Sequence, residues 1–260
     1  MFSYVNTGVA NIYKNPAFRS EVVSQAVLWE QLRCLERENH FIRVIAEDGY
    51  GGWINDFQVT EPDRNPDFEF KMITAPLVYF YSKPDDDSAM VRDATSGVRI
   101  PVIGDNSHWY QSVFPDGQTG WIKKSFFDDM PSNERGDLIR TAKKIIGIPY
   151  FWGGKTPKGF DCSGFTQWVY KMSGISLRRD AWMQFDDARA VSTDPLHGEP
   201  GDLYFFSEKD NKISHVGICA APGKIIHVRG MVRINSLDAA DPLFDRSLLD
   251  AFREIRTYLD

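Results

Sequence analysis

The sequence has no long apolar run and no cluster of positive charge. A membrane-spanning helix needs roughly 18 or more consecutive apolar residues, so we expect no membrane insertion. Residues 1–6 lack a basic segment followed by an apolar one, which a signal peptide would have. We therefore expect a cytoplasmic protein, with export after loss of a signal peptide as the alternative. The formal net charge of −6 and the dispersed Lys and Arg disfavour nucleic acid as a partner.

Cysteine is also scarce. The chain has three cysteines, Cys34, Cys162 and Cys219, which are widely spaced and form no Cys-x-x-Cys pair. This excludes a disulfide framework and disfavours a structural zinc site, so we expect no metal and no cofactor. With 42% hydrophobic and 25% charged residues, the composition is that of a folded globular protein.

A weak internal repeat occupies the first half of the chain. Residues 41–54 match residues 109–122 without a gap at the Asp-Gly, Gly-Trp and Ile positions, and the same alignment pairs Tyr13 with Tyr81. An Asp-Gly pair between two strand-like runs is typical of a hairpin turn. Each copy therefore predicts a strand, a tight turn and a second strand.

Three domains follow from this pattern. The repeat predicts two small SH3-like β-barrels at residues 1–62 and 68–129, joined by a polar, proline-bearing linker at 61–66. A second boundary is expected near 131–133, and the third domain covers 132–260.

The third domain is expected to be α+β, because helix-like segments come first and strand-like runs follow. Apolar residues recur at helical spacing over 138–146, a second helix follows Cys162 and ends near Gly174, and a third covers 181–189. The expected strands are 203–206, 214–219, 224–228 and 251–255.

Cys162 lies in the segment Phe-Asp-Cys-Ser-Gly-Phe, at the expected start of a helix. A helix N-terminus carries partial positive charge and free N–H groups, which favour a thiolate and can stabilise an oxyanion. The alternative is a buried structural cysteine. Asp161, Ser163 and Gly164 are too polar or too small for a core segment, so we favour a nucleophile.

A thiol nucleophile needs a base, and two histidines are available downstream. His215 and His227 lie in consecutive strand-like runs joined by a turn at 221–224. Such strands are expected to pair antiparallel, with each histidine facing a cleft. The alternative is that both are structural histidines within strands.

Five segments together resemble the NlpC/P60 family of cysteine peptidases. In order they are Tyr-Phe-Trp-Gly-Gly (150–154), Phe-Asp-Cys-Ser-Gly-Phe (160–165), Pro-Gly-Asp-Leu-Tyr-Phe-Phe (200–206), His-Val-Gly-Ile (215–218) and Ile-His (226–227). The resemblance covers about residues 134–256. With the two modules in front, it extends to the γ-D-glutamyl-L-diamino acid endopeptidases, which include enzymes called dipeptidyl-peptidase VI.

The resemblance implies a papain-like catalytic domain preceded by two bacterial SH3-like (SH3b) modules. It implies that Cys162 is the nucleophile and that His215 is the base. His227 would orient and polarise His215, and Tyr150 would line the oxyanion region beside the Cys162 N–H.

The resemblance also suggests substrate contacts. Asp161, and less strongly Ser163, would bind a free amine, and Trp152 would form a wall of the pocket. Arg179 and Asp180 match the family's Arg-Asp segment, where an arginine could grip a substrate carboxylate. Arg178 could equally belong to a solvated charge run, and Gln184 is expected on a helix surface.

In related enzymes the first module closes one end of the cleft, which suggests Glu30 and Tyr50 as contacts to the peptide N-terminus. The alternative is that both are exposed loop residues.

The implied reaction is hydrolysis of the γ-D-glutamyl–diamino acid bond in murein peptides with a free N-terminal L-Ala. This releases L-Ala-D-Glu and suits recycling of wall peptides. The alternatives are an amidase or acyltransferase on the same Cys-His-His site, and a non-catalytic wall-binding protein. Nothing in the sequence indicates an oligomeric state.

Overall fold

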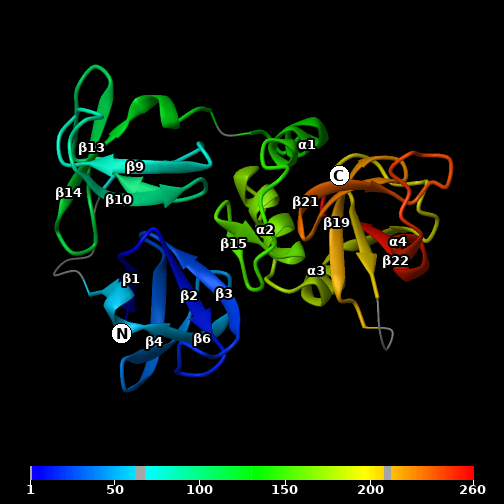
Figure 1. Ribbon diagram of the computed structural model, residues 1–260, viewed down its shortest axis with the longest axis horizontal. Helices are drawn as coiled ribbons and strands as arrows, with labels where there is room; N and C mark the ends of the chain where they lie inside the picture. Colours follow the sequence, from blue (N-terminus) through cyan, green and yellow to red (C-terminus); the bar gives the residue numbers. More distant parts are fainter. Residues whose placement is uncertain (1, 62–67, 130, 208–211) are drawn as a thin grey trace. The chain divides into compact units, whose positions relative to one another are not determined.

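The computed structural model describes residues 2–61, 68–129, 131–207 and 212–260 (Figure 1). The chain divides into two compact units, unit 1 at Met1–Met130 and unit 2 at Pro131–Asp260. The predicted linker covers residues 61–66, and its residues 62–66 lie outside the described residues. None of the described helices is long and apolar enough to cross a membrane.

Unit 1 consists almost entirely of antiparallel strands. Its first sheet has the order β3-β2-β6-β5-β4-β1-β7. These strands are β1 Phe2–Val5, β2 Val9–Tyr13, β3 Val22–Val27, β4 Gln31–Glu38, β5 Phe41–Ile45, β6 Gly51–Asn55 and β7 Val59–Thr60, with a 3-10 turn at Asp56–Gln58.

The second half of unit 1 forms a five-stranded sheet of order β10-β9-β14-β13-β12 and a two-stranded sheet of β11 and β8. The strands are β8 Phe70–Met72, β9 Leu77–Tyr81, β10 Met90–Thr95, β11 Arg99–Pro101, β12 Gly104–Asp105, β13 Trp109–Val113 and β14 Thr119–Lys123, followed by a 3-10 turn at Lys124–Phe126. The division of unit 1 into modules at 1–62 and 68–129 stays a prediction.

The sequence repeat corresponds to two hairpins of the same geometry. In β5–β6 and β13–β14 the turn glycines, Gly49 and Gly117, have φ values of 80° and 82°. Only glycine adopts this left-handed conformation without steric cost, which explains why an Asp-Gly turn occurs in both copies. Tyr13 pairs with Trp53 in one sheet and Tyr81 with Trp121 in the other.

The two halves of unit 1 share apolar packing. Leu28 and Trp29, from the first half, are buried in a cluster with Val78, Phe80 and other residues of the second half. The Trp29 indole N–H also donates a hydrogen bond to the Val113 carbonyl, at 3.0 Å. The two halves are therefore held together by their cores as well as by the chain connection.

Among its described residues, unit 2 combines four helices with a six-stranded antiparallel sheet of order β17-β22-β18-β19-β20-β21 and a small β15–β16 hairpin. The helices are α1 Arg135–Lys143, α2 Cys162–Met172, α3 Ala181–Asp187 and α4 Arg246–Ala251. The strands are β15 Lys155–Thr156, β16 Gly159–Phe160, β17 Arg189–Ser192, β18 Leu203–Phe206, β19 His215–Ala221, β20 Lys224–Arg229, β21 Met231–Ser236 and β22 Phe252–Thr257.

Helix α2 packs against β19 and β20. This contact brings the start of α2 to the strands that carry the two histidines. The α+β class is confirmed. The third helix ends at Asp187, two residues before the predicted end, because the chain turns extended at Ala188 to enter β17. The prediction missed β21, which pairs with β20 along its whole length.

Candidate active site

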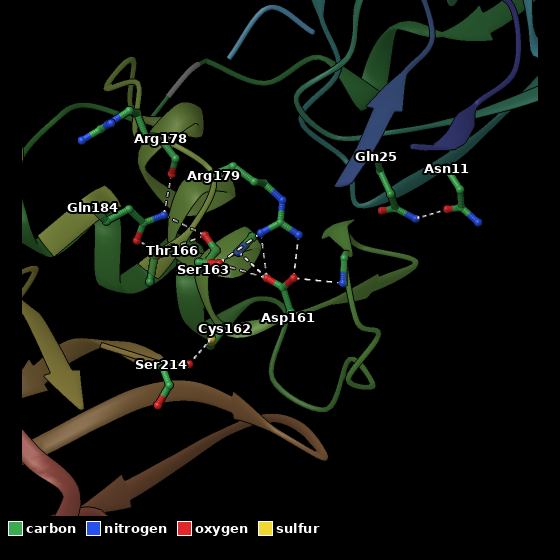
Figure 2. A network of polar contacts seen from close by, with 12 residues as sticks. Asn11, Gln25, Asp161, Cys162, Ser163, Thr166, Arg178, Arg179, Gln184 and Ser214 are labelled. Atoms are coloured by element: carbon green, nitrogen blue, oxygen red, sulfur yellow. Dashed lines mark hydrogen bonds and ion pairs between the residues drawn. The ribbon is translucent and has the colours of Figure 1, made fainter. Parts of the chain in front are cut away.

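Cys162 is the first residue of α2, as its sequence context predicts. The preceding Asp161 is the N-cap, with an extended backbone and a side chain that accepts a hydrogen bond from the Gly164 N–H at 2.7 Å. Capping by Asp is strongly favoured at this position. Cys162 is half-buried as a residue, and its Sγ lies 4.0 Å from the carbonyl oxygen of Ser214, the residue before His215 (Figure 2).

Asp161 is held from several sides inside unit 2. Its two carboxylate oxygens accept hydrogen bonds from the Arg179 guanidinium at 3.1 and 2.5 Å, and Oδ2 also accepts one from the Gly153 N–H at 3.0 Å. Arg179 is 1% exposed and also donates to the Ser163 hydroxyl at 3.1 Å (Figure 2). The predicted bidentate grip of Arg179 therefore exists, but it holds Asp161 and not a substrate carboxylate.

Gln184 supports the same turn from α3. Its amide donates to the Ser163 carbonyl at 3.1 Å and its Oε1 accepts from the Thr166 hydroxyl at 2.7 Å. The side chain is fully buried, so the expectation of a helix-surface residue is wrong. Arg178, in contrast, is exposed and pairs with Asp187 at 2.6 Å. Asp180 is the N-cap residue of α3, which carries no side-chain capping bond.

His215, His227 and Asn235 form a buried chain of hydrogen bonds across three strands. The His215 Nε2 lies 2.8 Å from the His227 Nδ1, and the His227 Nε2 lies 3.0 Å from the Asn235 Oδ1. The prediction that the histidines lie on paired antiparallel strands is confirmed. His227 is fully buried and His215 is 9% exposed, so the expectation that both face a cleft is wrong for His227.

The strand register explains this contact. His227 pairs directly with Gly217 on β19 and with Arg233 on β21, so His215 and Asn235 are its diagonal neighbours on the same face. A Cβ atom at Gly217 would lie 2.9 Å from the His227 Cβ. The missing side chain at Gly217 thus leaves the space in which the two imidazoles meet.

Burial sets the protonation of these groups. It raises the pKa of the Cys162 thiol to about 12, and the Asp161 carboxylate adds to that shift. Burial lowers the pKa of His215 to about 3, with a contribution from His227, and lowers the pKa of His227 to about 4. The expected lowering of the Cys162 pKa is therefore wrong, because burial outweighs the helix end. Near pH 7 the thiol and both imidazoles are neutral in the resting site.

Tyr150 and Trp152 lie on the loop that precedes β15. The Tyr150 N–H donates to the Gly230 carbonyl at 2.8 Å, which ties the loop to the turn after β20. The two side chains are 37% and 59% exposed. Large exposed aromatic side chains in this segment suit contact with a ligand, and their roles stay predictions.

Glu30 and Tyr50 belong to unit 1. Glu30 is 6% exposed and accepts a hydrogen bond from the Val27 N–H at 3.1 Å, so the alternative of an exposed loop residue is wrong for Glu30. Tyr50 is half-buried, and its N–H donates to the Asp48 carboxylate at 3.0 Å. Their proposed contact with a peptide N-terminus stays a prediction.

Two further observations complete the site. Within the parts of the chain that the structure describes, no three His, Cys, Asp or Glu side chains are grouped as a metal ion requires. Asn235 is the residue of the hydrogen-bonded chain that sequence reasoning missed. The sequence held one indication of its place: Asn235 is a polar residue in the run Met-Val-Arg-Ile-Asn-Ser (231–236), which follows the strand of His227 after one short turn.

Comparison with known proteins extends over both units. The family model of the NlpC/P60 family matches residues 147–251, and that of the bacterial dipeptidyl-peptidase Sh3 domain matches residues 12–58. A gamma-D-glutamyl-L-lysine dipeptidyl-peptidase of Bacillus cereus is 30% identical over 227 residues, which cover 80% of this chain and 67% of that protein. The Bacillus subtilis protein of the same name is 27% identical over 220 residues, covering 79% and 72%.

A crystal structure of an NlpC/P60 family protein from Bacillus cereus shares the fold, with a TM-score of 0.88, 23% identity and full coverage of both chains. The fold, the two family matches and the similarity to the Bacillus cereus peptidase agree. The chain belongs to the NlpC/P60 family.

Proposed function

We propose that this protein is a cysteine peptidase that hydrolyses murein peptides, with Cys162 as its nucleophile. The observation that carries the proposal is the arrangement around Cys162. The thiol begins α2 and lies 4.0 Å from the carbonyl next to His215, which is hydrogen-bonded to His227. The names of the two Bacillus relatives support peptide hydrolysis as the reaction.

The first half of the reaction forms a thioester. As the Cys162 Sγ attacks the substrate carbonyl carbon, its proton passes to His215, because neither group ionises by itself near pH 7. The negative charge on the carbonyl oxygen is stabilised by the Cys162 N–H at the start of α2, with Tyr150 beside it. The imidazolium of His215 then protonates the leaving amine, and the C–N bond breaks.

The second half releases the acyl group. His215, again neutral, takes a proton from a water molecule as that water attacks the thioester carbonyl. The S–C bond breaks, the proton returns to the Cys162 sulfur, and the free carboxylic acid leaves. His227 holds the His215 ring through the 2.8 Å contact between Nδ1 and Nε2, which keeps its free nitrogen aimed at the reaction.

The proposed substrate is a free murein peptide that begins L-Ala-γ-D-Glu-diamino acid. A carboxylate would favour its charged N-terminal amine, and we propose Asp161, Ser163 and Glu30 for this contact, with Tyr50 adding a hydrogen bond. Trp152 and Asp180 are proposed to border the peptide. Arg179 acts through Asp161, because its guanidinium is buried against that carboxylate.

This substrate predicts a sharp discrimination. Acetylation of the N-terminal alanine removes the charge that the carboxylates would recognise. Asp161 keeps Arg179 as its partner, so the cost of several kcal/mol for a buried carboxylate without a cation falls on Glu30. The enzyme should therefore release L-Ala-D-Glu from the free tripeptide and spare the peptide still joined to glycan. Such a preference suits the recycling of released wall peptides.

The test compares kcat/KM for L-Ala-γ-D-Glu-L-Lys with that for its N-acetylated form, and repeats both with meso-diaminopimelate in place of L-Lys. Glu30→Ala and Tyr50→Phe test the two unit 1 residues separately. Equal rates on the free and acetylated peptides contradict amine recognition. Faster hydrolysis of lipid or glutamine amides than of either peptide would instead make the protein an amidase on the same site.

A further inference from the structure

Asn235 lies at the buried end of the hydrogen-bonded chain and has two partners. It sits on β21, is 5% exposed, and faces His227 from a diagonal position of the sheet. Its Oδ1 lies 3.0 Å from the His227 Nε2, and its Nδ2 donates to the Leu243 carbonyl at 3.4 Å. Both ends of the amide are therefore engaged.

The second partner fixes which way the amide points. Rotation of the amide by 180° would bring its oxygen against the Leu243 carbonyl oxygen and its NH₂ group against His227. Two acceptors in contact in a buried place are unfavourable, since neither has a proton to share. The backbone of Leu243 is itself held, because its carbonyl also accepts from the Ser236 N–H at 2.8 Å. The oxygen of Asn235 thus faces His227.

An oxygen at that position determines the tautomers of both histidines. It only accepts, so the His227 Nε2 must carry the proton and the His227 Nδ1 has a free lone pair in the neutral ring. That lone pair accepts from the His215 Nε2, which must carry the proton of its own ring. The free lone pair of His215 is then on its Nδ1, the nitrogen that does not face His227.

We propose that Asn235 is a positioning residue that sets the tautomers of His227 and His215 and so keeps the His215 Nδ1 unprotonated as the base for Cys162. This inference rests on the proposed function of Cys162 and His215. The charged groups that act on the pair are Arg229 and Arg233, which disfavour protonation, and Asp245, which favours it at His227. Among the described residues, none of these three side chains accepts a hydrogen bond from the His227 ring. The acceptor is therefore Asn235.

The direct test is nitrogen-15 NMR of the imidazole rings, which needs no substrate. The protein has five histidines, and single His→Gln variants assign their signals. At pH 7 the wild-type protein should show His227 protonated on Nε2 and His215 also protonated on Nε2. Asn235→Leu should remove this preference, and Asn235→Asp, which keeps an acceptor, should retain it. A wild-type spectrum with the proton on the His227 Nδ1 overturns the proposal, even if Asn235→Leu does not fold.

The second test measures the rate of Cys162 alkylation by iodoacetamide against pH, again without substrate. Asn235→Leu should lower this rate, and kcat with it, by about 10- to 100-fold at unchanged KM, less than the loss of the base itself. Asn235→Asp should keep the rate within a few-fold and move its acid limb to higher pH, because a carboxylate favours the protonated imidazoles. Ser236→Ala, at the neighbouring buried position of β21, is the matched control and should change neither.

An alkylation rate unchanged in Asn235→Leu, or lowered equally in Asn235→Asp and Ser236→Ala, overturns the positioning role. A different result would contradict the proposed function. If no murein peptide is hydrolysed while the tautomers and alkylation rates behave as described, the substrate assignment is wrong and the role of Asn235 stands.

Discussion

Unit 1 and unit 2 are both rich in antiparallel strands, yet they bury different side chains. The clusters of unit 1 are apolar, built around residues such as Ile12, Val44 and Phe80, and Glu30 is the one charged side chain buried among its described residues. Among its described residues, unit 2 buries three charged side chains and both histidines of the candidate site: Asp161, Arg179, Asp202, His215 and His227.

This difference indicates where the chemistry lies. A buried charge costs several kcal/mol unless it is paired and hydrogen-bonded, so stability alone does not favour it. In unit 2 Asp202 pairs with Arg135 of α1, whereas the other four groups lie at the start of α2 and on β19 and β20, around Cys162 and His215. Glu30 is the exception in unit 1, and it is one of the residues proposed to contact the peptide amine.

The sharpest test of the comparison is removal of the nucleophile. Cys162→Ala should abolish hydrolysis of the free tripeptide, because it removes the thiol at the start of α2 that is proposed to attack the substrate carbonyl, and it should leave the fold intact. Iodoacetamide should label Cys162 faster than Cys34 or Cys219 at neutral pH, because His215 is proposed to accept the Cys162 proton as the neutral thiol reacts. Full hydrolytic activity in Cys162→Ala would contradict the mechanism.

The next largest effect is expected from the histidines. A positioned acid–base group contributes about 10²- to 10⁴-fold to the rate, so His215→Ala should lose most of the activity. His227→Ala should lose less, since His227 acts through its 2.8 Å contact with His215. The measurement is kcat for both variants at saturating peptide. The opposite ranking means that the two roles are exchanged.

The buried histidines predict a pH dependence of stability. In the unfolded chain both have a pKa near 6.5, whereas burial lowers the values to about 3 and about 4 in the folded unit. Between these values only the unfolded chain binds the protons, so the free energy of unfolding of unit 2 falls as pH falls below about 6.5. For the two histidines together, a fall of two pH units below about 6.5 lowers the free energy of unfolding by a value on the order of 5 kcal/mol.

Urea unfolding of the wild type and of His215→Asn/His227→Asn, measured from pH 7 to pH 4.5, checks this dependence. The double variant should lose less stability over that range than the wild type. Parallel curves would show that the histidines are not the groups responsible.

Two adjacent arginines give a matched comparison of buried and exposed charge. Arg179→Met should destabilise unit 2 by about 3–5 kcal/mol, because it leaves Asp161 buried without its partner. Arg178→Met should cost little stability, since its pair with Asp187 is exposed to solvent. Urea unfolding followed by tryptophan fluorescence measures both, and equal losses would contradict the structural role of the buried pair.

The smallest expected effect is that of a chelator. The proposed reaction uses a thiol and two imidazoles, so EDTA should leave kcat/KM unchanged. Activity lost in EDTA and restored by zinc would reject the thiol mechanism.

Much of the local structure was readable in the sequence. The Asp-Gly turns of the repeat, the helix that begins at Cys162 and the strand of residues 203–206 all depend on neighbours in the chain, such as a capping Asp161 or a glycine with positive φ. Strand β21 was missed because its alternation is short, and its place is set by pairing with β20.

The errors concern side chains whose surroundings come from distant parts of the chain. Arg179 was expected to grip a substrate and Gln184 to lie on a surface. Both are buried because α3 folds back onto the start of α2, 16 to 21 residues away in sequence. The pKa of Cys162 was expected to fall from its helix position, but burial by the surrounding elements raises it.

The sequence by itself determined the family and the hairpins of the repeat, and it singled out Cys162, His215 and His227 as candidate site residues, because these follow from residue type and local spacing. Only the tertiary structure decided that Asp161 is held by Arg179, that His227 is buried between His215 and Asn235, and that the thiol and imidazoles rest in their neutral forms. These properties depend on desolvation and on hydrogen-bond partners from other strands and helices, which are fixed only when the sheet and α2 pack together.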